Sequence, residues 1–319
     1  MIRHFLDVDE LSVDELTALL DRADAHRRHR RPSSSLGGRC IGLLFEKPST
    51  RTRVSFEVAV AELGGTPIVL SSRELQLGRG ETVADTARVL SRYLHALVVR
   101  TFAQHRLEEL AAAGSIPVIN ALSDASHPCQ VLADMQTVRA RLGSLSGVRL
   151  AFVGDGNNVA HSLLAVGALA GLHTTIVTPA GHEADAQVVA DARATATASG
   201  GSVTITTDPA IGLKDAQAVY TDVWASMGQE NQQAERLARF RPYQVNVELL
   251  DLAAPDAIVL HCLPAHRGDE ITDDVIDGPR SVVWDQAENR LHAQKALLEL
   301  LLGSRSGLPG GAAVGPRDE

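Results

Sequence analysis

The chain has 319 residues, of which 45% are hydrophobic and 22% are charged, and its formal net charge at pH 7 is −9. Such a chain is long enough for two domains of ordinary size and too apolar for wholesale disorder. The acidic balance argues against a general binder of nucleic acid or of anionic membranes, because both need a basic face. Small anionic substrates stay open, since a pocket can be locally basic inside an acidic protein.

Three cysteines, Cys40, Cys129 and Cys262, lie far apart and form neither a disulfide framework nor a C-x-x-C metal spacing. A reducing cytoplasm is the simpler interpretation of this pattern. Residues 1–5 lack an apolar signal core, and no stretch approaches the run of about 18 apolar residues that spans a membrane. We therefore expect a soluble, cytoplasmic protein without membrane association.

The first half of the chain alternates short apolar strands with helices. Ser12 followed by Glu15 is a capping box, which predicts the start of the first helix. A helical pattern also follows the first strand and stops at Gly64-Gly65, and another helix begins near Pro128. The strands of this half are expected at 41–45, 67–70, 96–100 and 117–120.

The alternation restarts after a turn at 143–147, with strands expected at 149–153, 174–177, 202–206, 218–221, 257–261 and 282–284. Strands that alternate with helices indicate parallel sheets. We therefore predict an α/β fold of two domains, each with a central parallel sheet flanked by helices, and the second is Rossmann-like. The expected domains are 1–140, with a final helix at 291–302 packing back on it, and 148–290. Residues 303–319 are expected to form a disordered tail.

Ser49-Thr50-Arg51-Thr52-Arg53 stands where a strand passes into a helix. Free N–H groups at a helix start favour an anion, hydroxyls add donors, and the planar arginine fork suits phosphate oxygens. The alternative is a capped helix with solvated arginines, but two arginines alternating with three hydroxyls favour an anion site. Arg100 ends another strand, where ligands of α/β sheets usually bind. His127 and Gln130 both stand at the opening of a helix.

Three motifs of this half resemble the carbamoyl-phosphate half of the carbamoyltransferases: F-E-K-P-S-T-R-T-R at 45–53, Q-L-G-R-G-E at 76–81 and H-P-C-Q at 127–130. The resemblance implies that Arg100 and His127 polarise the carbamoyl oxygen and that Gln130 binds near the carbamoyl amine. Attack by an amine puts negative charge on this oxygen, and each preorganised donor there is worth about 3–4 kcal/mol. The carbamoyl-phosphate-binding residues so implied are Ser49, Thr50, Arg51, Thr52, Gln76, Arg100, His127 and Gln130.

Residues 154–159, G-D-G-N-N-V, follow a strand and start a helix, which invites a dinucleotide-binding interpretation. That interpretation fails because Val159 stands at the third glycine position and because the next strand ends without an acid for a ribose. The fold can still be Rossmann-like, with the loop serving another ligand. Asn157 and Asn158 could cap the helix, or one of them could bind substrate.

Two further strand ends carry polar groups. Asp222 follows the strand at 218–221, where a carboxylate can pair with an ammonium group, although such a residue is more often a loop cap. His261 and Cys262 end the strand at 257–261, but neighbours on a strand point to opposite faces and so do not form a Cys-His nucleophile. The spacing of His261, Cys262 and His266 fits no usual zinc pattern, and we expect no metal.

The motifs D-x-x-x-S-M-G at 222–228 and H-C-L-P at 261–264 resemble the ornithine branch of the carbamoyltransferases. The aspartate branch lacks them and needs cationic residues for a second carboxylate. The resemblance implies that ornithine is bound by Asn158, Asp222, Ser226 and Met227. It further implies that Asp222 and Cys262 lie beside the reacting amine, that Cys262 and Leu263 also contact the carbamoyl amine, and that Arg290 returns to the phosphate. The implied catalytic residues are Arg100, His127, Asp222 and Cys262.

The expected reaction uses carbamoyl phosphate and L-ornithine, gives L-citrulline and phosphate, and needs no cofactor, metal or covalent intermediate. The resemblance implies a homotrimer, with Gln76 possible as a residue of the neighbouring site. The same site serves biosynthesis and the reverse use of citrulline, so the sequence sets no direction. Three rivals stay open: carbamoylation of putrescine or an acylated ornithine, a dehydrogenase, and a catalytically silent homologue.

Overall fold

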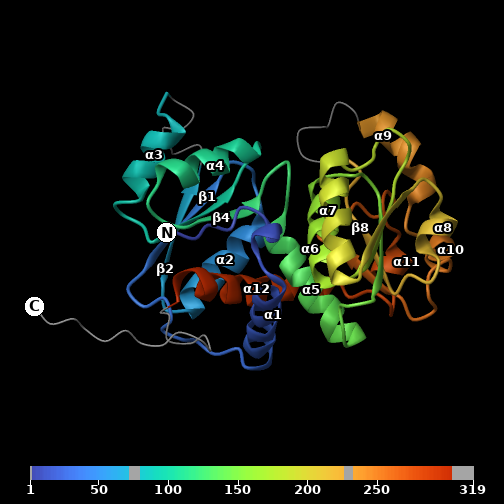
Figure 1. The fold of residues 1–319 in the computed structure, drawn as a ribbon, viewed down its shortest axis with the longest axis horizontal. Helices are drawn as coiled ribbons and strands as arrows, with labels where there is room; N and C mark the ends of the chain where they lie inside the picture. The colour runs from blue at the N-terminus through green and yellow to red at the C-terminus, as the bar shows by residue number, and fades with distance from the viewer. Residues whose placement is uncertain (1, 72–79, 226–232, 304–319) are drawn as a thin grey trace, which may run out of the picture.

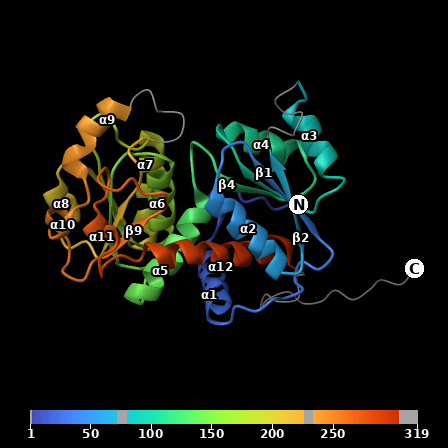
Figure 2. The ribbon, with the colours of Figure 1, turned by 180° about the vertical axis from the view of Figure 1, so that it is seen from behind.

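The computed structural model describes residues 2–71, 80–225 and 233–303, and this part of the chain forms two parallel sheets that lie side by side (Figures 1 and 2). The first sheet has the order β2-β1-β3-β4, with β1 (Cys40–Phe45), β2 (Thr66–Ser71), β3 (Ala96–Arg100) and β4 (Val118–Leu122). The second has the order β7-β6-β5-β8-β9, with β5 (Arg149–Val153), β6 (His173–Val177), β7 (Ser202–Thr206), β8 (Ala218–Thr221) and β9 (Ile258–His261). The second order is that of a Rossmann-like sheet, so the predicted fold class is confirmed.

Helices cover both faces of the first sheet because its strands are apolar on both sides. Leu43 and Val98 face one way and pack in a cluster with residues of α1, α2 and α12, whereas Leu44, Leu97 and Val99 face the other way, towards α3 and α4. The helices of this half are η1 (Val8–Glu10), α1 (Val13–Arg28), α2 (Thr50–Glu62), α3 (Val83–Leu90), α4 (Gln104–Ala113) and α5 (Pro128–Leu142).

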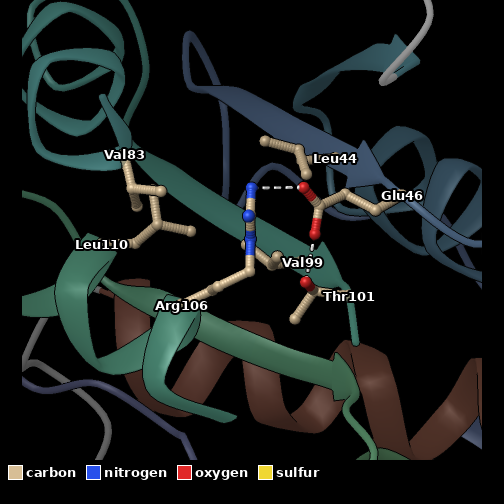
Figure 3. A pocket seen from close by; sticks show the side chains of 7 residues that line it. All are labelled: Leu44, Glu46, Val83, Val99, Thr101, Arg106 and Leu110. Carbon is tan, nitrogen blue, oxygen red and sulfur yellow. Dashed lines mark hydrogen bonds and ion pairs between the residues drawn. The ribbon is translucent and has the colours of Figure 1, made fainter. Parts of the chain in front are cut away.

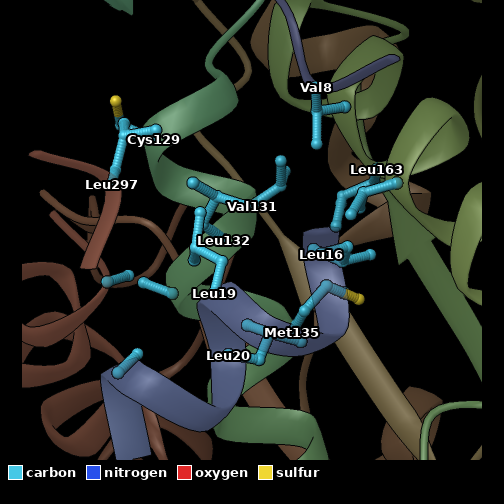
Figure 4. Close-up of a cluster of buried hydrophobic side chains, with 14 of the residues drawn as sticks. Val8, Leu16, Leu19, Leu20, Cys129, Val131, Leu132, Met135, Leu163 and Leu297 are labelled. Atoms are coloured by element: carbon cyan, nitrogen blue, oxygen red, sulfur yellow. The ribbon is translucent and has the colours of Figure 1, made fainter. Parts of the chain in front are cut away.

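Helix α1 begins where the capping box predicts. Ser12 Oγ accepts the N–H of Glu15, and the Glu15 carboxylate accepts the N–H of Ser12. The apolar face of α1 then meets α5 and α6 in the cluster of Figure 4, where Leu16, Leu19 and Leu20 are buried beside Met135. One polar pair of residues thus sets the helix start that brings this face into register with the core.

The second sheet is built in the same way. Leu150 and Phe152 of β5 pack with residues of α6 and α7, whereas Ala151 and Val153 face the opposite cluster, which includes Leu213 of α8. The helices of this half are α6 (Asn158–Ala170), α7 (Ala186–Ser199), α8 (Pro209–Leu213), α9 (Gln233–Phe240), η4 (Arg241–Tyr243), α10 (Val247–Leu250), α11 (Asp273–Ile276) and α12 (Val283–Leu302).

The strand predicted at 282–284 is wrong, because α12 begins at Val283 rather than at Leu291. Val282 donates its N–H to Val259 O beside β9 and is followed directly by helix. Two adjacent valines favour a strand in isolation, but the chain here leaves the sheet edge and turns along α5, and this tertiary context overrides the local preference. The other nine predicted strands are confirmed to within two residues at each end.

Helix α12 leaves the second sheet and lies against α1, α2 and α5 (Figures 1 and 2). We propose the domain division 1–140 and 148–290 on this architecture, with the helix at 291–302 belonging to the first domain. Of the expected tail at 303–319, all but Gly303 lies outside the described residues. Within the described ranges, no helix combines the length and the apolar character needed to cross a bilayer.

Candidate active site

Each sheet has one point where the strand order reverses, and ligands of open α/β sheets bind at the carboxyl ends of such strands. In the first sheet the point lies between β1 and β3, which lead into the Ser49 segment and end at Arg100. In the second it lies between β5 and β8, which lead into the 154–158 turn and to Asp222. Cys262 follows β9, the neighbour of β8. The topology therefore gathers the predicted residues at the carboxyl-terminal edges of the two sheets. The edge of the first sheet, with Ser49–Thr52 and Arg100, is called the first edge, and that of the second sheet, with Asp222 and Cys262, the second edge.

The segment after β1 is a capped helix start that also holds an arginine from the far end of the chain. Ser49 Oγ accepts the N–H of Thr52, and Thr52 Oγ1 accepts a hydrogen bond of 2.7 Å from Arg290 Nη2. Arg53 turns away to form a 2.8 Å ion pair with Glu57 on the exposed side of α2. Of the two arginines in the predicted anion site, only Arg51 therefore stays with the strand ends.

The loop before Ser49 is held by contacts of Glu46. Glu46 accepts hydrogen bonds from Arg106 Nη2, at 2.6 Å, and from Thr101 Oγ1, and its N–H donates to Arg100 O. Figure 3 shows these groups beside a small cavity under α3 and α4. Lys47 pairs with Asp124. Glu46 and Lys47, the charged residues at the start of the motif, thus stabilise the loop that precedes Ser49.

Three arginines form a positive cluster at this edge. Arg100 and Arg290 are 8% and 3% exposed, and Nε of each is buried without a hydrogen-bond partner among the described residues. Burial, followed by the like charges of Arg290 and Arg51, lowers the pKa of Arg100 to about 10. Burial likewise lowers the pKa of Arg290 and of Arg51. All three stay cationic at pH 7, and their crowding favours an anion between them.

His127 and Gln130 add uncharged groups to the same edge. His127 is held by a hydrogen bond of 2.8 Å from its N–H to Ser162 Oγ, and its ring Nδ1 is buried with no partner in the described part of the chain. Burial and the two nearby arginines lower the pKa of His127 well below its ordinary value, so the ring is neutral at pH 7. Gln130 uses its amide N–H towards Asp134, whereas its Oε1 has no partner among the described residues.

The second edge is organised around the Asp222 carboxylate, which is 6% exposed. Cys262 Sγ donates to Asp222 Oδ1 at 2.9 Å, and Asn157 Nδ2 donates to Asp222 Oδ2 at 3.0 Å. Burial and the charge of Asp222 raise the pKa of the Cys262 thiol well above its ordinary value, so it is protonated at pH 7. Cys262 is therefore a hydrogen-bond donor here and not a thiolate nucleophile.

His261, Cys262 and Asp222 place three potential metal-binding atoms within 4.8 Å of one another. The ring nitrogens of His261 are both engaged, because Nδ1 accepts the N–H of Leu263 at 2.8 Å and Nε2 lies 3.1 Å from Glu270 Oε1. The first bond helps to hold Leu263 at a φ of 59°, a conformation that costs a residue with a Cβ about 1–2 kcal/mol. His261 thus supports the backbone turn after Cys262.

The two edges face one another. The negative charge of Asp222 opposes the lowering of the pKa of Arg100, so this carboxylate of the second edge acts on the arginine of the first. A buried network beneath them also joins the edges. Asp134 Oδ1 accepts from Gln130 Nε2 at 2.8 Å and from Gln286 Nε2 at 2.7 Å. Gln286 Oε1 then accepts the N–H of His261 at 2.9 Å, so α5, α12 and β9 are linked by side chains.

Sequence reasoning missed Asp134 and Gln286, although the spacing of Gln130 and Asp134 places them on one helix face. Asn157 is the N-cap of α6, whereas Asn158 Nδ2 donates to Ser123 O at 2.7 Å. The predicted residues Gln76, Ser226 and Met227 lie outside the described residues. Thr50 is exposed at the first turn of α2, and the remaining predicted residues lie at the two edges.

The glycine pattern of the 154–158 turn is explained by packing within the chain. A Cβ on Gly156 would lie 2.2 Å from the backbone nitrogen of Ala184, so only glycine fits there. Its N–H donates to His182 O. Gly156 is thus required by a contact within the chain. It therefore gives no support for a dinucleotide phosphate at this turn.

Comparison with known proteins agrees with this geometry. Residues 3–140 match the family model "Aspartate/ornithine carbamoyltransferase, carbamoyl-P binding domain", and residues 146–301 match "Aspartate/ornithine carbamoyltransferase, Asp/Orn binding domain". A protein named ornithine carbamoyltransferase from Parafrankia sp. is 56% identical over 99% of both chains. The structure of ornithine carbamoyltransferase from Pyrococcus furiosus superposes with a TM-score of 0.91 at 51% identity, over 94% of this chain and 97% of that one.

The anabolic ornithine carbamoyltransferase from Campylobacter jejuni superposes with a TM-score of 0.90 at 36% identity, over 94% of this chain and 99% of that one. A curated relative from Pyrococcus furiosus, named "Ornithine carbamoyltransferase, anabolic", is 51% identical over 94% of this chain and 96% of its own length. Both family models together span nearly all the residues that form the two edges. The chain belongs to the aspartate/ornithine carbamoyltransferase family.

Proposed function

We propose that the chain is an ornithine carbamoyltransferase, which transfers the carbamoyl group of carbamoyl phosphate to the δ-amine of L-ornithine and gives L-citrulline and phosphate. The proposal rests on two groups that face each other: a cationic edge, whose buried Nε atoms have no partner among the described residues, and a carboxylate–thiol pair. The first suits a phosphate and a polarised carbonyl, and the second suits an amine. The names of the relatives support the same reaction.

On the first edge, carbamoyl phosphate is bound by the start of α2 and by the arginine cluster. The phosphate lies at the N–H groups of α2 near Ser49, Thr50, Arg51 and Thr52, where both the helix dipole and the arginines favour a dianion. Arg290, which contacts Thr52, closes the same site from α12. When the C–O bond to phosphate breaks, the bonding pair leaves with a group that these cations already neutralise.

The carbamoyl group lies between the unpartnered donors and acceptors of the buried side chains. Arg100 and neutral His127 donate to the carbonyl oxygen, which becomes negative as the amine attacks. Gln130 Oε1 has no partner among the described residues and accepts an N–H of the carbamoyl amine, as do the backbone carbonyls at Cys262 and Leu263. These contacts orient the carbonyl carbon towards the second edge.

The second edge receives ornithine. Asp222 attracts the δ-ammonium, and Asp222 with Cys262 orients the nitrogen as it loses a proton, because an amine with an ordinary pKa of about 10.4 is mostly protonated at pH 7. Asn158, Ser226 and Met227 hold the amino-acid end, as the resemblance implies. We propose that carbamoyl phosphate binds first and that ornithine then enters between the edges.

We also propose a homotrimer with Gln76 reaching the neighbouring site, and a cytoplasmic location that keeps Cys40, Cys129 and Cys262 as the free thiols seen in the structure. The biosynthetic direction is proposed because two of the similar proteins are named anabolic. Light scattering of the purified chain tests the trimer. A monomeric active enzyme would contradict it.

Citrulline formation tests the function directly. The purified chain is incubated with carbamoyl phosphate and, in parallel, with ornithine, putrescine, acetylornithine or aspartate, and the carbamoylated product and phosphate are measured. We expect citrulline and phosphate in equal amounts from ornithine alone. Activity on another amine without ornithine activity would overturn the substrate, and no phosphate release with any amine would overturn the reaction class.

A further inference from the structure

Asn157 makes two kinds of hydrogen bond with its two side-chain ends. Its Oδ1 accepts the N–H of Val159 at 2.9 Å and the N–H of Ala160 at 3.2 Å, which caps α6. Its Nδ2 donates to Asp222 Oδ2 at 3.0 Å. Only an amide side chain of this length offers an acceptor to the helix and a donor to the carboxylate at once.

The carboxylate of Asp222 is thereby held from two directions. Asn157, at the start of α6, bonds one oxygen, and Cys262, after β9, bonds the other at 2.9 Å. Two donors on different oxygens fix the plane of a carboxylate, and a charged acceptor strengthens each bond. The remaining lone pairs then point in a set direction.

The backbone that carries Asn157 is itself fixed. Its N–H donates to Asp155 O at 2.7 Å, and Gly156 leaves no room for a Cβ against Ala184. The Asp155 side chain pairs with Arg236, which is 7% exposed and also bonds Trp224 O. The amide of Asn157 is therefore preorganised by its neighbours rather than free to follow Asp222.

We propose that Asn157 is a positioning residue for the reaction, which acts by orienting Asp222 towards the substrate amine. This proposal rests on the proposed carbamoyl transfer to ornithine. Asn158 has a different part, because its amide turns to Ser123 O on the first edge. The two adjacent asparagines thus have different roles. Asn157 contacts the Asp222 carboxylate and not the substrate.

The test separates the cap from the donor. Serine and aspartate cap a helix about as well as asparagine, but Asn157→Ser removes the donor and Asn157→Asp replaces it with a second carboxylate. We expect both variants to keep the carbamoyl phosphate dissociation constant and Asn157→Ser to keep a Tm within about 2 °C of the wild type, whereas repulsion between two buried carboxylates lowers the Tm of Asn157→Asp. We expect kcat with ornithine to fall about tenfold in Asn157→Ser, and further in Asn157→Asp, because a hydrogen bond to a charged group is lost or replaced by repulsion.

Two controls make the result specific. Asp185 caps α7 and accepts the N–H groups of Gln187 and Val188, so Asp185→Ala removes a cap in the same half without touching Asp222. It should lower Tm and leave kcat unchanged. In an Asp222→Asn background, Asn157→Ser should have little further effect on kcat, because the bond that it removes no longer orients a charge.

Each outcome decides the proposal. Wild-type kcat in Asn157→Ser, or a full additional loss in the Asp222→Asn background, overturns it and leaves Asn157 as a cap only. Loss of carbamoyl phosphate binding or a large fall in Tm in both cap-competent variants also overturns it, because Asn157 then supports the fold. Absence of citrulline with the wild-type chain in the same assay instead refutes the proposed function.

Discussion

On the first edge of the site, four buried polar atoms have no hydrogen-bond partner among the described residues. They are Nε of Arg100, Nε of Arg290, Nδ1 of His127 and Oε1 of Gln130. On the second edge, both oxygens of Asp222 already accept hydrogen bonds. The polar groups of the first edge therefore keep hydrogen-bonding capacity that the described protein does not use, whereas both oxygens of Asp222 are engaged within the protein.

This difference bears on the order of binding. Carbamoyl phosphate can bond several of these groups at once and neutralise the crowded cations, and it needs no rearrangement of Asp222 to do so. An amine gains less alone, because Asp222 has its own donors in place. The comparison thus favours carbamoyl phosphate as the first substrate, and it is open to four tests.

The largest effect is expected from Arg51→Ala compared with Arg53→Ala. These arginines stand two residues apart in one motif, but Arg51 belongs to the cationic edge and Arg53 is paired with Glu57 at the surface. We expect kcat/KM for carbamoyl phosphate to fall about 10²–10³-fold in Arg51→Ala, in line with the loss of one preorganised donor, and to stay near the wild-type value in Arg53→Ala. Equal losses in the two variants would contradict the assignment of Arg51, and not Arg53, to the cationic edge.

A smaller loss is expected on the second edge from Cys262→Ala. The alanine leaves one oxygen of Asp222 without its donor, whereas Cys262→Ser supplies a hydroxyl in its place. We expect kcat with ornithine to fall about 10-fold to 100-fold in the alanine variant and less in the serine variant. Steady-state citrulline assays with saturating carbamoyl phosphate measure this. A serine variant as slow as the alanine variant would show that the thiol has another role.

The network between the edges gives a prediction on stability. Burial raises the pKa of Asp134 to about 7, against about 3.9 for an unfolded aspartate. Between these values the folded chain holds a proton that the unfolded chain has released, so this carboxyl makes the protein less stable as pH rises from about 4 to about 7. Asp134→Asn cannot ionise and keeps an oxygen that accepts from Gln130 and Gln286.

We therefore expect the unfolding free energy of Asp134→Asn to exceed that of the wild type by about 1–4 kcal/mol more at pH 7 than at pH 4. Urea unfolding at both pH values measures the difference. Asp134→Ala is the contrasting variant, because it leaves both amides without their acceptor and should be less stable than Asp134→Asn at either pH. A pH-independent gap between wild type and Asp134→Asn would show that Asp134 keeps its charge throughout.

The smallest effect concerns His127, which is neutral at pH 7 because burial and two arginines lower its pKa well below the ordinary value. Sulfate is a dianion throughout the neutral range and should compete with carbamoyl phosphate. We expect its inhibition constant to change by less than about twofold between pH 6 and pH 8, since a His titrating at its ordinary pKa of about 6.5 would tighten sulfate binding at pH 6. Stronger inhibition at pH 6 that His127→Gln abolishes would mean that the ring is charged in the site.

The sequence predicts those site residues whose place follows from a single local rule. Positions at strand ends predict Arg100 and Asp222, because the carboxyl ends of parallel strands share an edge, whereas Cys262 enters through the family resemblance. The sequence does not show in which direction a single side chain points. It therefore groups Arg53 with Arg51, although the Arg53 side chain pairs with Glu57.

Contacts between distant segments were also beyond sequence reasoning. The bond from Arg290 to Thr52 joins residues 238 apart, and the bonds of Gln286 depend on where α12 begins. That start was wrongly predicted, since Val282 and Val283 favour a strand until the surrounding fold is known. The sequence leaves Asn157 and Asn158 both open as the cap, and the donation of Asn157 to Asp222 depends on how two strand ends meet.

The path of α12 has a consequence for the growing chain. Arg290 reaches Thr52 from a helix that ends at Leu302, so the proposed phosphate site of the first half is completed by a residue that is synthesised long after Thr52. At about 5–20 residues per second, the segment carrying Thr52 waits of the order of ten seconds or more for its partner. A nascent chain that has finished its first sheet therefore still lacks one arginine of the proposed anion site, and carbamoyl phosphate gains its full stabilising contacts only once Arg290 has been synthesised and folded onto α2.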